Sequence, residues 1–393
     1  MSEIGSKRRI LKLVFMINSD LRNGGGMERV LLNYIKYIPE NFKNIYHITI
    51  VQTGLLEKER IKKDEIDTIL KENNIVLITL DQYNKNLFDM KIGILNTVFN
   101  TLTETIRNRK YKHDIYKITS RADVVYLFHN SFSYFIPEGP IVIGSFHERN
   151  IDPRAYKGLS SILIKLTTIL IKHKLLFRRI DYYHYIDNNY KSFVPKNSFY
   201  LPNGADIDRY IMKYHEREID EIVRILFVGR LVKCKGLNLL IEAFRKINDK
   251  GKYELHIVGS GEMQAYIQNS KIKGLIYHGQ VDDDELLRIY KKCDIFVFPS
   301  ICDIMSLAVL EALASGEYVI VDKTLKGVFD DFEKLGILEY ANHDPSDIAS
   351  RILKFKKNFE QNKNVEELLK NYNWKEIVNK LYVIFQDVII KII

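Results

Sequence analysis

The chain has 393 residues, of which 46% are hydrophobic and 28% are charged. This is a globular composition, and the length suits two domains better than one. No uninterrupted apolar run exceeds five residues, which excludes a membrane-spanning helix. Residues 1–9 lack the pattern of a signal peptide, so none is expected.

The net charge of +9 is concentrated in the first half of the chain. Residues 1–205 hold 31 basic and 20 acidic side chains, whereas the rest holds 28 basic and 30 acidic ones. Such an asymmetry predicts an anionic partner for the first half. Composition leaves three kinds of partner open: a membrane surface, a nucleic acid or a phosphorylated substrate.

The chain contains three cysteines, Cys234, Cys293 and Cys302. Their number is odd, and their spacing matches no metal site. A reducing cytoplasm suits them, and we exclude a disulfide scaffold.

Short apolar runs alternate with amphipathic stretches along the first half, which is the pattern of βαβ units and a mainly parallel sheet. Residues 10–17 are predicted to form the first strand, followed by the loop Gly24-Gly25-Gly26 and a helix over residues 27–37. Further strands are expected at residues 46–51, 75–80, 124–128, 141–146, 182–186 and 199–201.

Residues 205–224 are polar and charged, and we interpret them as a linker. The pattern then restarts, with a helix around residues 237–250 and strands at residues 225–228, 254–258, 275–278, 295–298 and 318–321. The predicted fold is α/β, with two doubly wound, Rossmann-like domains at residues 1–205 and 206–373. A ligand is expected in the cleft between them, at the carboxyl ends of the strands.

The last segment, about residues 365–393, is predicted to be helical. It either completes the second domain or crosses back onto the first. We assign residues 374–393 to the first domain.

The Gly24-Gly25-Gly26 loop joins a strand to a helix, where free backbone N–H groups and the helix dipole favour an anion. The loop is not a GxGxxG motif, and no acidic residue ends the second strand, so a nicotinamide cofactor is not expected. Gly25 and Gly26 are therefore candidates for substrate contact. The alternative is a tight turn that needs a positive φ.

Arg230 and Lys235 lie in the loop between the first strand and the first helix of the second domain. Two cations there can hold a diphosphate through charge-assisted hydrogen bonds of about 1.5–3 kcal/mol each. The alternative is a pair of solvated charges on a surface loop.

Residues 300–311 follow the strand at residues 295–298. Ser306 is a suitable N-cap, and the backbone N–H groups of Met305, Ser306 and Leu307 would form a second anion site. Glu311, on an apolar helix, is costly to bury unless it is hydrogen-bonded. Its partner is expected to be either a sugar hydroxyl or a residue of the core.

The run Asp282-Asp283-Asp284 has two interpretations. It could be a metal-binding DxD motif, or it could be the N-terminus of a helix, where acidic residues complement the dipole. A helical sequence follows immediately, so we favour the helix N-terminus and predict no metal.

Residues 153–180 contain seven Lys or Arg and no acidic residue. These charges exclude a spanning helix but allow one that lies on a membrane surface, and the alternative is packing on the first domain. No nucleic-acid-binding motif accompanies the segment, so a nucleic acid is not expected. The residues expected to contact a membrane or a lipid-linked acceptor are Lys165, Lys172, Lys174, Arg178 and Arg179.

Together, these motifs resemble the retaining glycosyltransferases of family 4, which have the GT-B fold. The resemblance covers nearly the whole chain and is densest at residues 224–322. It rests on the order and spacing of Gly25-Gly26-Met27-Glu28-Arg29, Leu201-Pro202-Asn203-Gly204-Ala205-Asp206, Val228-Gly229-Arg230, Lys235-Gly236, Val258-Gly259-Ser260-Gly261, His278-Gly279-Gln280-Val281 and the block from Asp303 to Glu311.

The resemblance implies roles for the second domain. Arg230 and Lys235 would bind the donor diphosphate and stabilise it as the leaving group, and Glu311 would hold the nucleotide ribose. The residues implied to line the base and ribose pocket are Gly261, Glu262 and Val281.

Three features of the second domain differ from the family pattern, and one further residue of the pattern lies in the first domain. Asp303 stands where the family has a glutamate that contacts the donor sugar. Met305-Ser306-Leu307 replace Phe-Gly-Leu, and Tyr318 replaces a proline. His147, at the end of a first-domain strand, resembles the histidine that the family directs at the donor sugar and the acceptor.

The function implied is retaining transfer of a hexose or N-acetylhexosamine from a nucleotide-diphosphate sugar, with UDP favoured. The acceptor would be a lipid-linked glycan in surface polysaccharide assembly, at the inner face of the plasma membrane. The leaving diphosphate would accept the acceptor's proton, so no buried base, cofactor or metal is expected, and stabilisation would be electrostatic. The alternatives are a GT-B sugar-nucleotide epimerase and a noncatalytic GT-B partner subunit.

Overall fold

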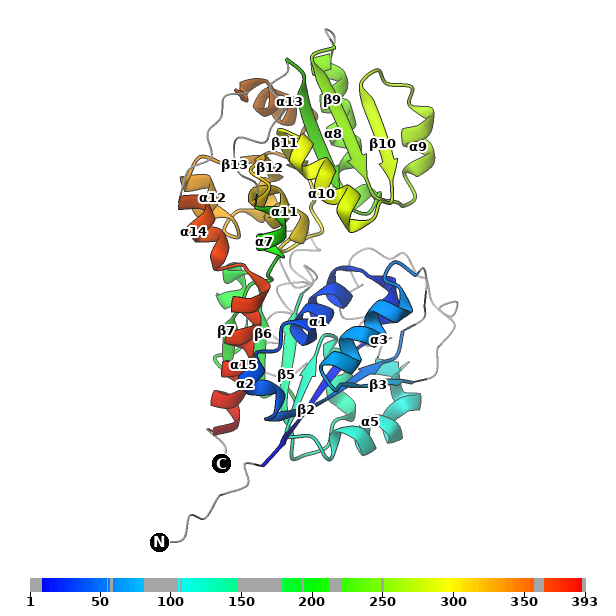
Figure 1. The fold of residues 1–393 in the computed structure, drawn as a ribbon, viewed down its shortest axis with the longest axis vertical. Helices are drawn as coiled ribbons and strands as arrows, with labels where there is room; N and C mark the ends of the chain where they lie inside the picture. The colour runs from blue at the N-terminus through cyan, green and yellow to red at the C-terminus, as the bar shows by residue number, and fades with distance from the viewer. Residues whose placement is uncertain are drawn as a thin grey trace. The chain divides into compact units, whose positions relative to one another are not determined.

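The computed structural model describes residues 9–54, 56, 59–80, 105–106, 108–147, 179–192, 194–211, 221–248, 251–356 and 364–390. The chain divides into two units, of which the first is Met1–Pro202 with Trp374–Ile393 and the second is Asn203–Asn373 (Figure 1). The predicted boundary, after residue 205, lies close to this division. Each unit is an α/β structure built on one parallel sheet.

In the described part of the first unit, seven strands form a sheet in the order β3-β2-β1-β4-β5-β6-β7. The chain moves outward from β1 to β3 and then returns to the other side of β1, which is doubly wound topology. The strands are β1 (Leu11–Ile17), β2 (Tyr46–Gln52), β3 (Val76–Thr79), β4 (Val124–Leu127), β5 (Ile141–Phe146), β6 (Tyr182–Tyr185) and β7 (Ser198–Tyr200). The described helices are α1 (Gly26–Lys36), α2 (Glu40–Lys43), α3 (Lys63–Glu72), α5 (Lys112–Thr119) and α15 (Trp374–Ile390).

The core of the first unit is aromatic. Phe15 of β1 packs against Tyr126 of β4 and Phe385 of α15, with ring centroids 5.6 Å and 6.2 Å apart, and all three side chains are fully buried. Trp374, at the start of α15, packs against Tyr34 of α1. Burial of each large apolar side chain stabilises by about 1.5–3 kcal/mol, so these contacts hold the C-terminal helix on the first unit.

The second unit contains six strands in the order β10-β9-β8-β11-β12-β13, counted over its described residues. They are β8 (Val223–Val228), β9 (Tyr253–Val258), β10 (Leu275–Gly279), β11 (Ile295–Phe298), β12 (Tyr318–Asp322) and β13 (Leu338–Ala341). The helices are α7 (Ile207–Tyr210), α8 (Leu237–Ile247), α9 (Gln264–Asn269), α10 (Asp283–Lys292), α11 (Leu307–Ala314), α12 (Asp330–Lys334), α13 (Pro345–Lys354) and α14 (Asn364–Lys370).

The start of α8 needs a glycine. Gly236 has a φ of +71°, and a Cβ atom there would lie 2.1 Å from the carbonyl oxygen of Pro299. Only glycine tolerates both conditions. The loop after β8 therefore lies directly against the end of β11.

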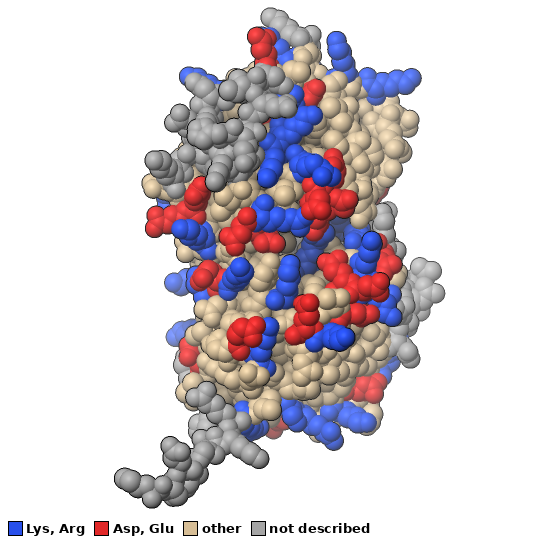
Figure 2. Space-filling view, in the orientation of Figure 1, with Lys and Arg blue, Asp and Glu red and all other residues tan. Residues whose placement is uncertain are grey.

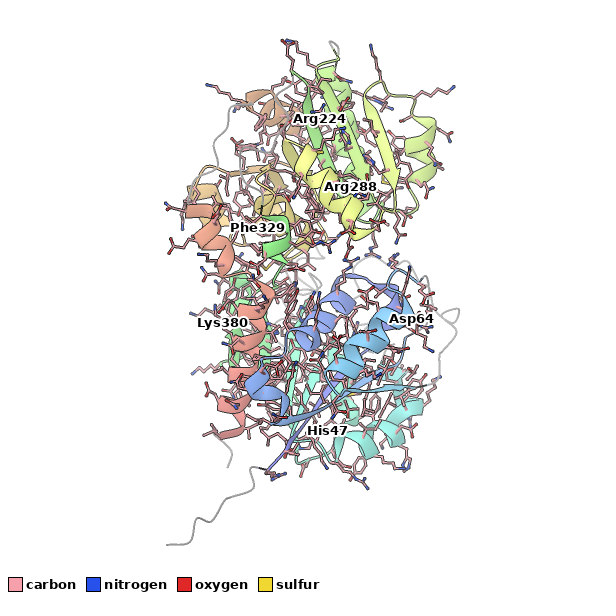
Figure 3. All side chains as sticks on the ribbon, in the orientation of Figure 1. His47, Asp64, Arg224, Arg288, Phe329 and Lys380 are labelled. Carbon is pink, nitrogen blue, oxygen red and sulfur yellow. A yellow bond between two sulfur atoms is a disulfide. The ribbon has the colours of Figure 1, made fainter. Side chains whose placement is uncertain are left out.

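Charged side chains are distributed over both units. Figure 2 shows Lys and Arg interspersed with Asp and Glu on the face drawn there. Arg224, which Figure 3 labels, lies on β8 and is buried, with its Nε atom 3.2 Å from Glu254 Oε2 of β9. This partner compensates the cost of burying a guanidinium group.

The predicted elements differ from the structure at two places. The predicted linker at residues 205–224 contains α7, and β8 begins within it at Val223. The C-terminal segment forms α14 and α15 instead of one helix, and Asn373 between them pairs with Ala205 in an isolated bridge. None of the helices in the described ranges is long and apolar enough to cross a membrane.

The cysteines correct one expectation. Cys234 and Cys302 form a disulfide with their Cα atoms 5.7 Å apart, whereas Cys293 is a buried free thiol. No disulfide scaffold was expected, because the number of cysteines is odd and a reducing cytoplasm suits them. The two cysteines meet because their loops follow the neighbouring strands β8 and β11.

Candidate functional site

The loop after β8 is anchored by one apolar residue and carries two candidate cations. Leu231 is fully buried, and its backbone bonds Ser260 O and the N–H of Met263 in the loop after β9. Arg230, beside it, is exposed, and no hydrogen bond or ion pair of its side chain is found among the described residues. Lys235 ends the short helical turn Lys233–Lys235. Both cations are therefore held on one short, anchored loop.

Lys235 forms an ion pair with Asp303. Its Nζ atom lies 2.6 Å from both carboxylate oxygens of Asp303, and the two side chains are 12% and 20% exposed. Lys235 Nζ also lies 5.5 Å from the centre of the Phe298 ring, which favours a cation there. The structure thus joins two residues to which the sequence analysis gave separate roles.

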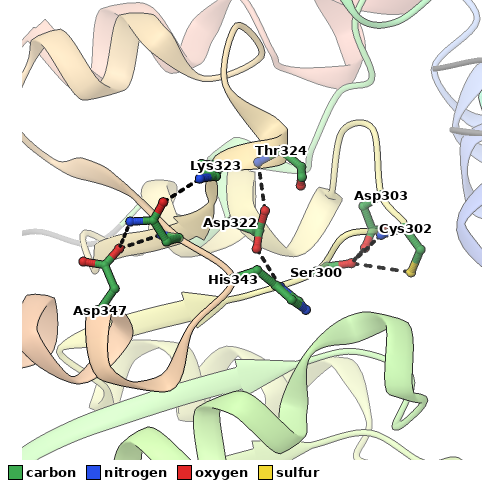
Figure 4. A network of polar contacts seen from close by, with 9 residues as sticks. Ser300, Cys302, Asp303, Asp322, Lys323, Thr324, His343 and Asp347 are labelled. Atoms are coloured by element: carbon green, nitrogen blue, oxygen red, sulfur yellow. Dashed lines mark hydrogen bonds and ion pairs between the residues drawn. The ribbon is translucent and has the colours of Figure 1, made fainter. Parts of the chain in front are cut away.

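The carboxylate of Asp303 has a second donor. Ser300, which is fully buried just after β11, donates its hydroxyl to Asp303 Oδ2 (Figure 4). Ser300 Oγ also accepts from the backbone N–H of Cys302 at 3.3 Å. These bonds, with the disulfide to Cys234, hold the Asp303 loop against the Lys235 loop.

The first turn of α11 agrees with prediction only in part. Ser306 is at the N-cap position, but its side chain makes no capping hydrogen bond. The side chains of Met305 and Ser306 are buried, and Leu307 is half-buried. The expected N-cap position of Ser306 is therefore confirmed, although its hydroxyl makes no capping hydrogen bond, and the expected anion contacts of these N–H groups stay a prediction.

Glu311 of α11 has a protein partner. Tyr290 of α10 is fully buried, and its hydroxyl donates to Glu311 Oε2 at 3.1 Å. Burial and the neighbouring Glu311 carboxylate raise the pKa of Tyr290 well above its usual value of 10, so the hydroxyl keeps its proton. Of the two expected partners for Glu311, the structure therefore supplies a core residue.

The loops after β9 and β10 hold the remaining second-unit candidates. Gly261 has a φ of +157°, and a Cβ there would lie 2.6 Å from Leu231 O, so a side chain would displace the loop after β8. Glu262 is exposed, and its Oε1 atom accepts from the Lys233 N–H at 3.4 Å. Val281 is half-buried after β10. Gly261 and Glu262 thus adjoin the loop that carries Arg230 and Lys235.

The triple-aspartate run is a helix N-terminus. Asp282 is the N-cap of α10, and its side chain accepts from Glu285 N at 2.8 Å. Arg209 of α7 contacts Asp283 at 3.4 Å and Asp284 at 2.7 Å. This confirms the interpretation as a helix terminus. Within the described ranges, no group of three or more His, Cys, Asp or Glu could hold a metal ion.

A second polar network in Figure 4 holds the turns after β12 and β13. Asp322, which is buried, accepts from Thr324 N at 2.8 Å and lies 2.8 Å from His343 Nδ1. Asn342 bonds Lys323 and Asp347. These hydrogen bonds join the side chains to turn backbone or to one another, so we assign a structural role to this network.

The glycines of the Gly24-Gly25-Gly26 loop have different structural roles. Gly24 has a φ of +58°, whereas Gly25 and Gly26 open α1. A Cβ on Gly25 would lie 2.6 Å from Glu28 Oε2, and the buried Glu28 accepts a hydrogen bond from Ser19. The tight-turn alternative is therefore correct for Gly24, and close approach explains Gly25. Substrate contact by Gly25 and Gly26 stays a prediction.

His147 directly follows β5, and its ring lies against those of Phe128, Tyr126 and His184. Its ring stacks on Phe128 at 5.3 Å, and its Nε2 atom lies 3.4 Å from Tyr126 Oη. Burial, with His184 and His129 nearby, lowers the pKa of His147 well below 6.5, so the ring is neutral at pH 7. It can accept or donate a hydrogen bond without carrying charge.

Most of the basic segment lies outside the described residues. Lys165, Lys172, Lys174 and Arg178 belong to that part. Arg179 is described, and its Nη2 atom donates to Pro137 O at 2.6 Å, which is a contact within the first unit. Membrane contact by the segment stays a prediction.

Sequence reasoning missed Tyr290, Ser300, Tyr126 and His184. His184 gave a usable signal, because a histidine in a short buried strand of aromatic residues must be hydrogen-bonded. Ser300 gave a weaker one, as a serine at the end of a buried strand. Tyr126 and Tyr290 gave none, because a buried tyrosine is ordinary core.

Residues 213–375 match the family model described as glycosyl transferases group 1. An uncharacterized glycosyltransferase from Methanocaldococcus jannaschii is 36% identical over 26% of this chain and 27% of its own length. A second uncharacterized glycosyltransferase from the same organism is 23% identical over 81% of this chain and 91% of its own length. An uncharacterized 41.2 kDa protein in the cps region of Klebsiella pneumoniae is 27% identical over 59% of this chain and 65% of its own length.

Solved structures share the fold. HepE of Anabaena, in complex with UDP and glucose, superposes with a TM-score of 0.63 at 13% identity, over 96% of this chain and 99% of HepE. Sucrose-phosphate synthase from Thermosynechococcus elongatus gives a TM-score of 0.66 at 13% identity, over 96% of this chain and 99% of the synthase. The predicted fold class, two parallel-sheet Rossmann-like units of GT-B type, is thereby confirmed.

Proposed function

We propose that this chain is a retaining glycosyltransferase that moves a hexose or N-acetylhexosamine from a nucleotide-diphosphate sugar, with UDP favoured, to a lipid-linked glycan. The observation that carries the proposal is the Lys235–Asp303 ion pair beside Arg230, on loops after β8 and β11. Those loops lie inside the segment that matches glycosyl transferases group 1. The carboxyl ends of parallel strands are where such folds bind nucleotides.

The diphosphate is assigned to the two cations. An ammonium group has three N–H donors, and the Asp303 oxygens occupy only one side of Lys235 Nζ. Arg230 is exposed on the same loop. As the bond to the sugar breaks, negative charge grows on the diphosphate, and fixed cations beside it stabilise the transition state.

Asp303 is assigned to the donor sugar. Its carboxylate is held by Lys235 and Ser300, and an ionised carboxylate can accept about four hydrogen bonds. Sugar hydroxyls can therefore bind its remaining lone pairs. His147 would contact the donor sugar and the acceptor from the first unit, and the leaving diphosphate would take the acceptor's proton on the same face of the sugar. We expect neither a metal nor an organic cofactor.

The ribose and base are assigned to the neighbouring loops. Glu311, oriented by Tyr290, would accept from the ribose hydroxyls. Gly261, Glu262 and Val281 would line the pocket of the base. UDP is favoured on the resemblance of the motifs, and HepE, a structure with the same fold, is described with UDP and glucose.

The acceptor is assigned to the basic first half. The excess of basic over acidic side chains in residues 1–205 favours an anionic surface or a lipid-phosphate-linked glycan. A relative encoded in a cps region supports surface polysaccharide synthesis. We propose peripheral attachment at the inner face of the plasma membrane through residues 153–180. Flotation with anionic vesicles should depend on salt and on Lys172 and Lys174, and absence of flotation would contradict it.

Two other functions share this fold. A sugar-nucleotide epimerase needs the same nucleotide site, and fold does not separate the two activities. A noncatalytic partner subunit would not need the site at all. The combination of Arg230, Lys235 and Glu311 in this chain argues against the noncatalytic subunit.

The test is calorimetry with UDP, GDP and ADP and with their sugars, followed by assays of hydrolysis and transfer. We expect one nucleotide to bind, and Lys235→Ala to weaken that binding. Lys233→Ala is the matched control, because Lys233 is exposed on the same turn. A protein that epimerises the sugar without transferring it supports the epimerase. No hydrolysis, no transfer and unchanged binding in Lys235→Ala would overturn the proposed enzyme.

A further inference from the structure

Three neighbouring strands of the first unit bring three polar rings together. Tyr126 lies on β4, His147 follows β5, and His184 lies on β6, and these strands are adjacent in the sheet. Tyr126 Oη is 2.5 Å from His184 Nδ1 and 3.4 Å from His147 Nε2. Tyr126 and His184 are fully buried. The three side chains form one chain of hydrogen bonds.

The positions of the protons in this row of hydrogen bonds follow from the protonation of His184. His184 Nε2 lies 2.7 Å from the carbonyl oxygen of Leu201. A carbonyl can only accept, so Nε2 carries a proton. Burial lowers the pKa of His184 to about 4, so the ring is neutral at pH 7 and its Nδ1 is an acceptor. Tyr126 must therefore donate its hydroxyl to His184.

The same reasoning extends to His147. Because the Tyr126 proton points to His184, Tyr126 Oη can only accept from His147. An unprotonated Nε2 on His147 would place two lone pairs opposite each other, so Nε2 carries the proton. His147 is neutral, and its other nitrogen, Nδ1, is then a bare acceptor. Nδ1 is buried and has no hydrogen-bond partner among the described residues.

Three other groups near the rings leave the hydrogen bond from Tyr126 to His184 unchanged. Tyr34, whose ring centroid lies 6.1 Å from that of Tyr126, helps to raise the pKa of Tyr126 and can donate only to a remaining lone pair of its hydroxyl. Ser145 donates its hydroxyl to Leu127 O at 2.8 Å, so it does not donate to Tyr126. His129 Nδ1 accepts from the N–H of Asn18 at 3.1 Å. Phe128 stacks on one face of the His147 ring, and the His184 ring meets it edge-on at 5.4 Å. The ring of His147 is thus fixed in position as well as in protonation.

We infer that Tyr126 and His184 are positioning residues, which hold His147 as the tautomer protonated at Nε2 and reserve its Nδ1 to accept a hydrogen bond from a substrate hydroxyl. The inference rests on the proposed function, because it is a sugar or acceptor hydroxyl that Nδ1 would bind. A buried acceptor without a partner destabilises the folded protein. An acceptor in this state can be satisfied by the hydroxyl of a ligand.

The tautomer can be measured without any activity. In the full-length protein labelled with ¹⁵N in its histidine rings, long-range ¹H–¹⁵N correlation distinguishes protonated from bare ring nitrogens. The His147→Asn variant assigns the signals by their loss. At pH 7 we expect His147 to be protonated at Nε2 and bare at Nδ1. In Tyr126→Phe, which lacks the hydroxyl acceptor, we expect a mixture of both tautomers.

The kinetic consequence is measured on the same variants. Tyr126→Phe is expected to lower kcat roughly tenfold, the equivalent of one hydrogen bond, with the KM for the donor sugar nearly unchanged. Tyr382→Phe is the matched control, because Tyr382 is a fully buried tyrosine of the same unit whose hydroxyl has no hydrogen-bond partner in the described part of the chain. It should change neither the His147 tautomer nor kcat.

The outcomes separate this inference from the proposed function. Protonation of His147 at Nδ1 in the unmodified protein would overturn the inference even if transfer is observed. So would a Tyr126→Phe variant that shifts the tautomer but keeps kcat. If the unmodified protein transfers no sugar while His147 shows the expected tautomer, the proposed function fails. The assignment of protons to Tyr126, His147 and His184 is then still supported.

Discussion

Lys235 Nζ lies 2.6 Å from both carboxylate oxygens of Asp303, although 68 residues separate the two along the chain. The pair is partly buried, with side chains 12% and 20% exposed. An ion pair of this kind neutralises the cation that a diphosphate would need. The donor must therefore either share Lys235 with Asp303 or compete for it.

Replacing Asp303 with asparagine tests this relationship. Asp303→Asn keeps the shape of the side chain but removes its charge, so Lys235 becomes a stronger partner for a diphosphate. We expect UDP to bind as well as before or more tightly. Turnover should fall about 10- to 100-fold, because charge-assisted bonds to the sugar are worth about 1.5–3 kcal/mol. Asp303→Glu is the control that keeps the charge. Loss of UDP binding in Asp303→Asn would contradict the assignment.

The Cys234–Cys302 disulfide should stabilise the second unit. It closes a loop of 68 residues, for which the chain-entropy model gives about 4 kcal/mol. Adding dithiothreitol should lower the Tm of the unmodified protein by roughly 10 °C. Cys302→Ser should start from the lower Tm and show no response to the reductant. A Tm that dithiothreitol leaves unchanged in the unmodified protein would contradict this prediction.

The strands could be predicted because burial leaves a local pattern. The predicted ranges 141–146 and 295–298 coincide with β5 and β11, whose residues are all buried. Runs that are apolar at every position are typical of central strands of a parallel sheet. The helix over 27–37 was found within one residue of α1, because its apolar residues recur with helical spacing.

The contacts between loops could not be predicted, for a physical reason. Lys235 meets Asp303 only because β8 and β11 are neighbours in the sheet, and this follows from the path of the whole chain. Local periodicity records which face of an element is buried, and it carries no information on which loops meet. The hydrogen bonds among Tyr126, His147 and His184 depend on strand order in the same way.

The Tyr290–Glu311 hydrogen bond should matter for the ribose. In Tyr290→Phe, Glu311 loses a donor at 3.1 Å and is held less firmly. We expect the affinity for the nucleotide diphosphate to fall roughly three- to tenfold, since a typical hydrogen bond contributes about 0.5–1.5 kcal/mol.

The control for Tyr290→Phe is the 2′-deoxynucleotide, measured by the same calorimetry. If Glu311 acts through the ribose, the substitution and the missing hydroxyl should not be additive. Additive losses would show that Tyr290 affects binding in another way.

The stability of the protein should depend on the charge of His184. Burial lowers its pKa to about 4, against about 6.5 in an unfolded chain. As the pH falls, the unfolded state binds this proton first. The free energy of unfolding is therefore unaffected by His184 above about pH 6.5 and decreases between about pH 6.5 and pH 4, by about 3 kcal/mol in all.

Urea unfolding of the unmodified protein and of His184→Asn, at several pH values in this range, measures the effect. The variant is less stable at every pH because Tyr126 loses its acceptor, so the slopes are compared instead of the absolute values. We expect the slope of the variant to be smaller by up to about 1.4 kcal/mol per pH unit. His256, whose pKa burial also lowers to about 4, contributes equally to both proteins and cancels. Part of the difference in slope comes from His147, because His184 helps to lower the pKa of His147. Equal slopes would show that His184 is not kept neutral by burial.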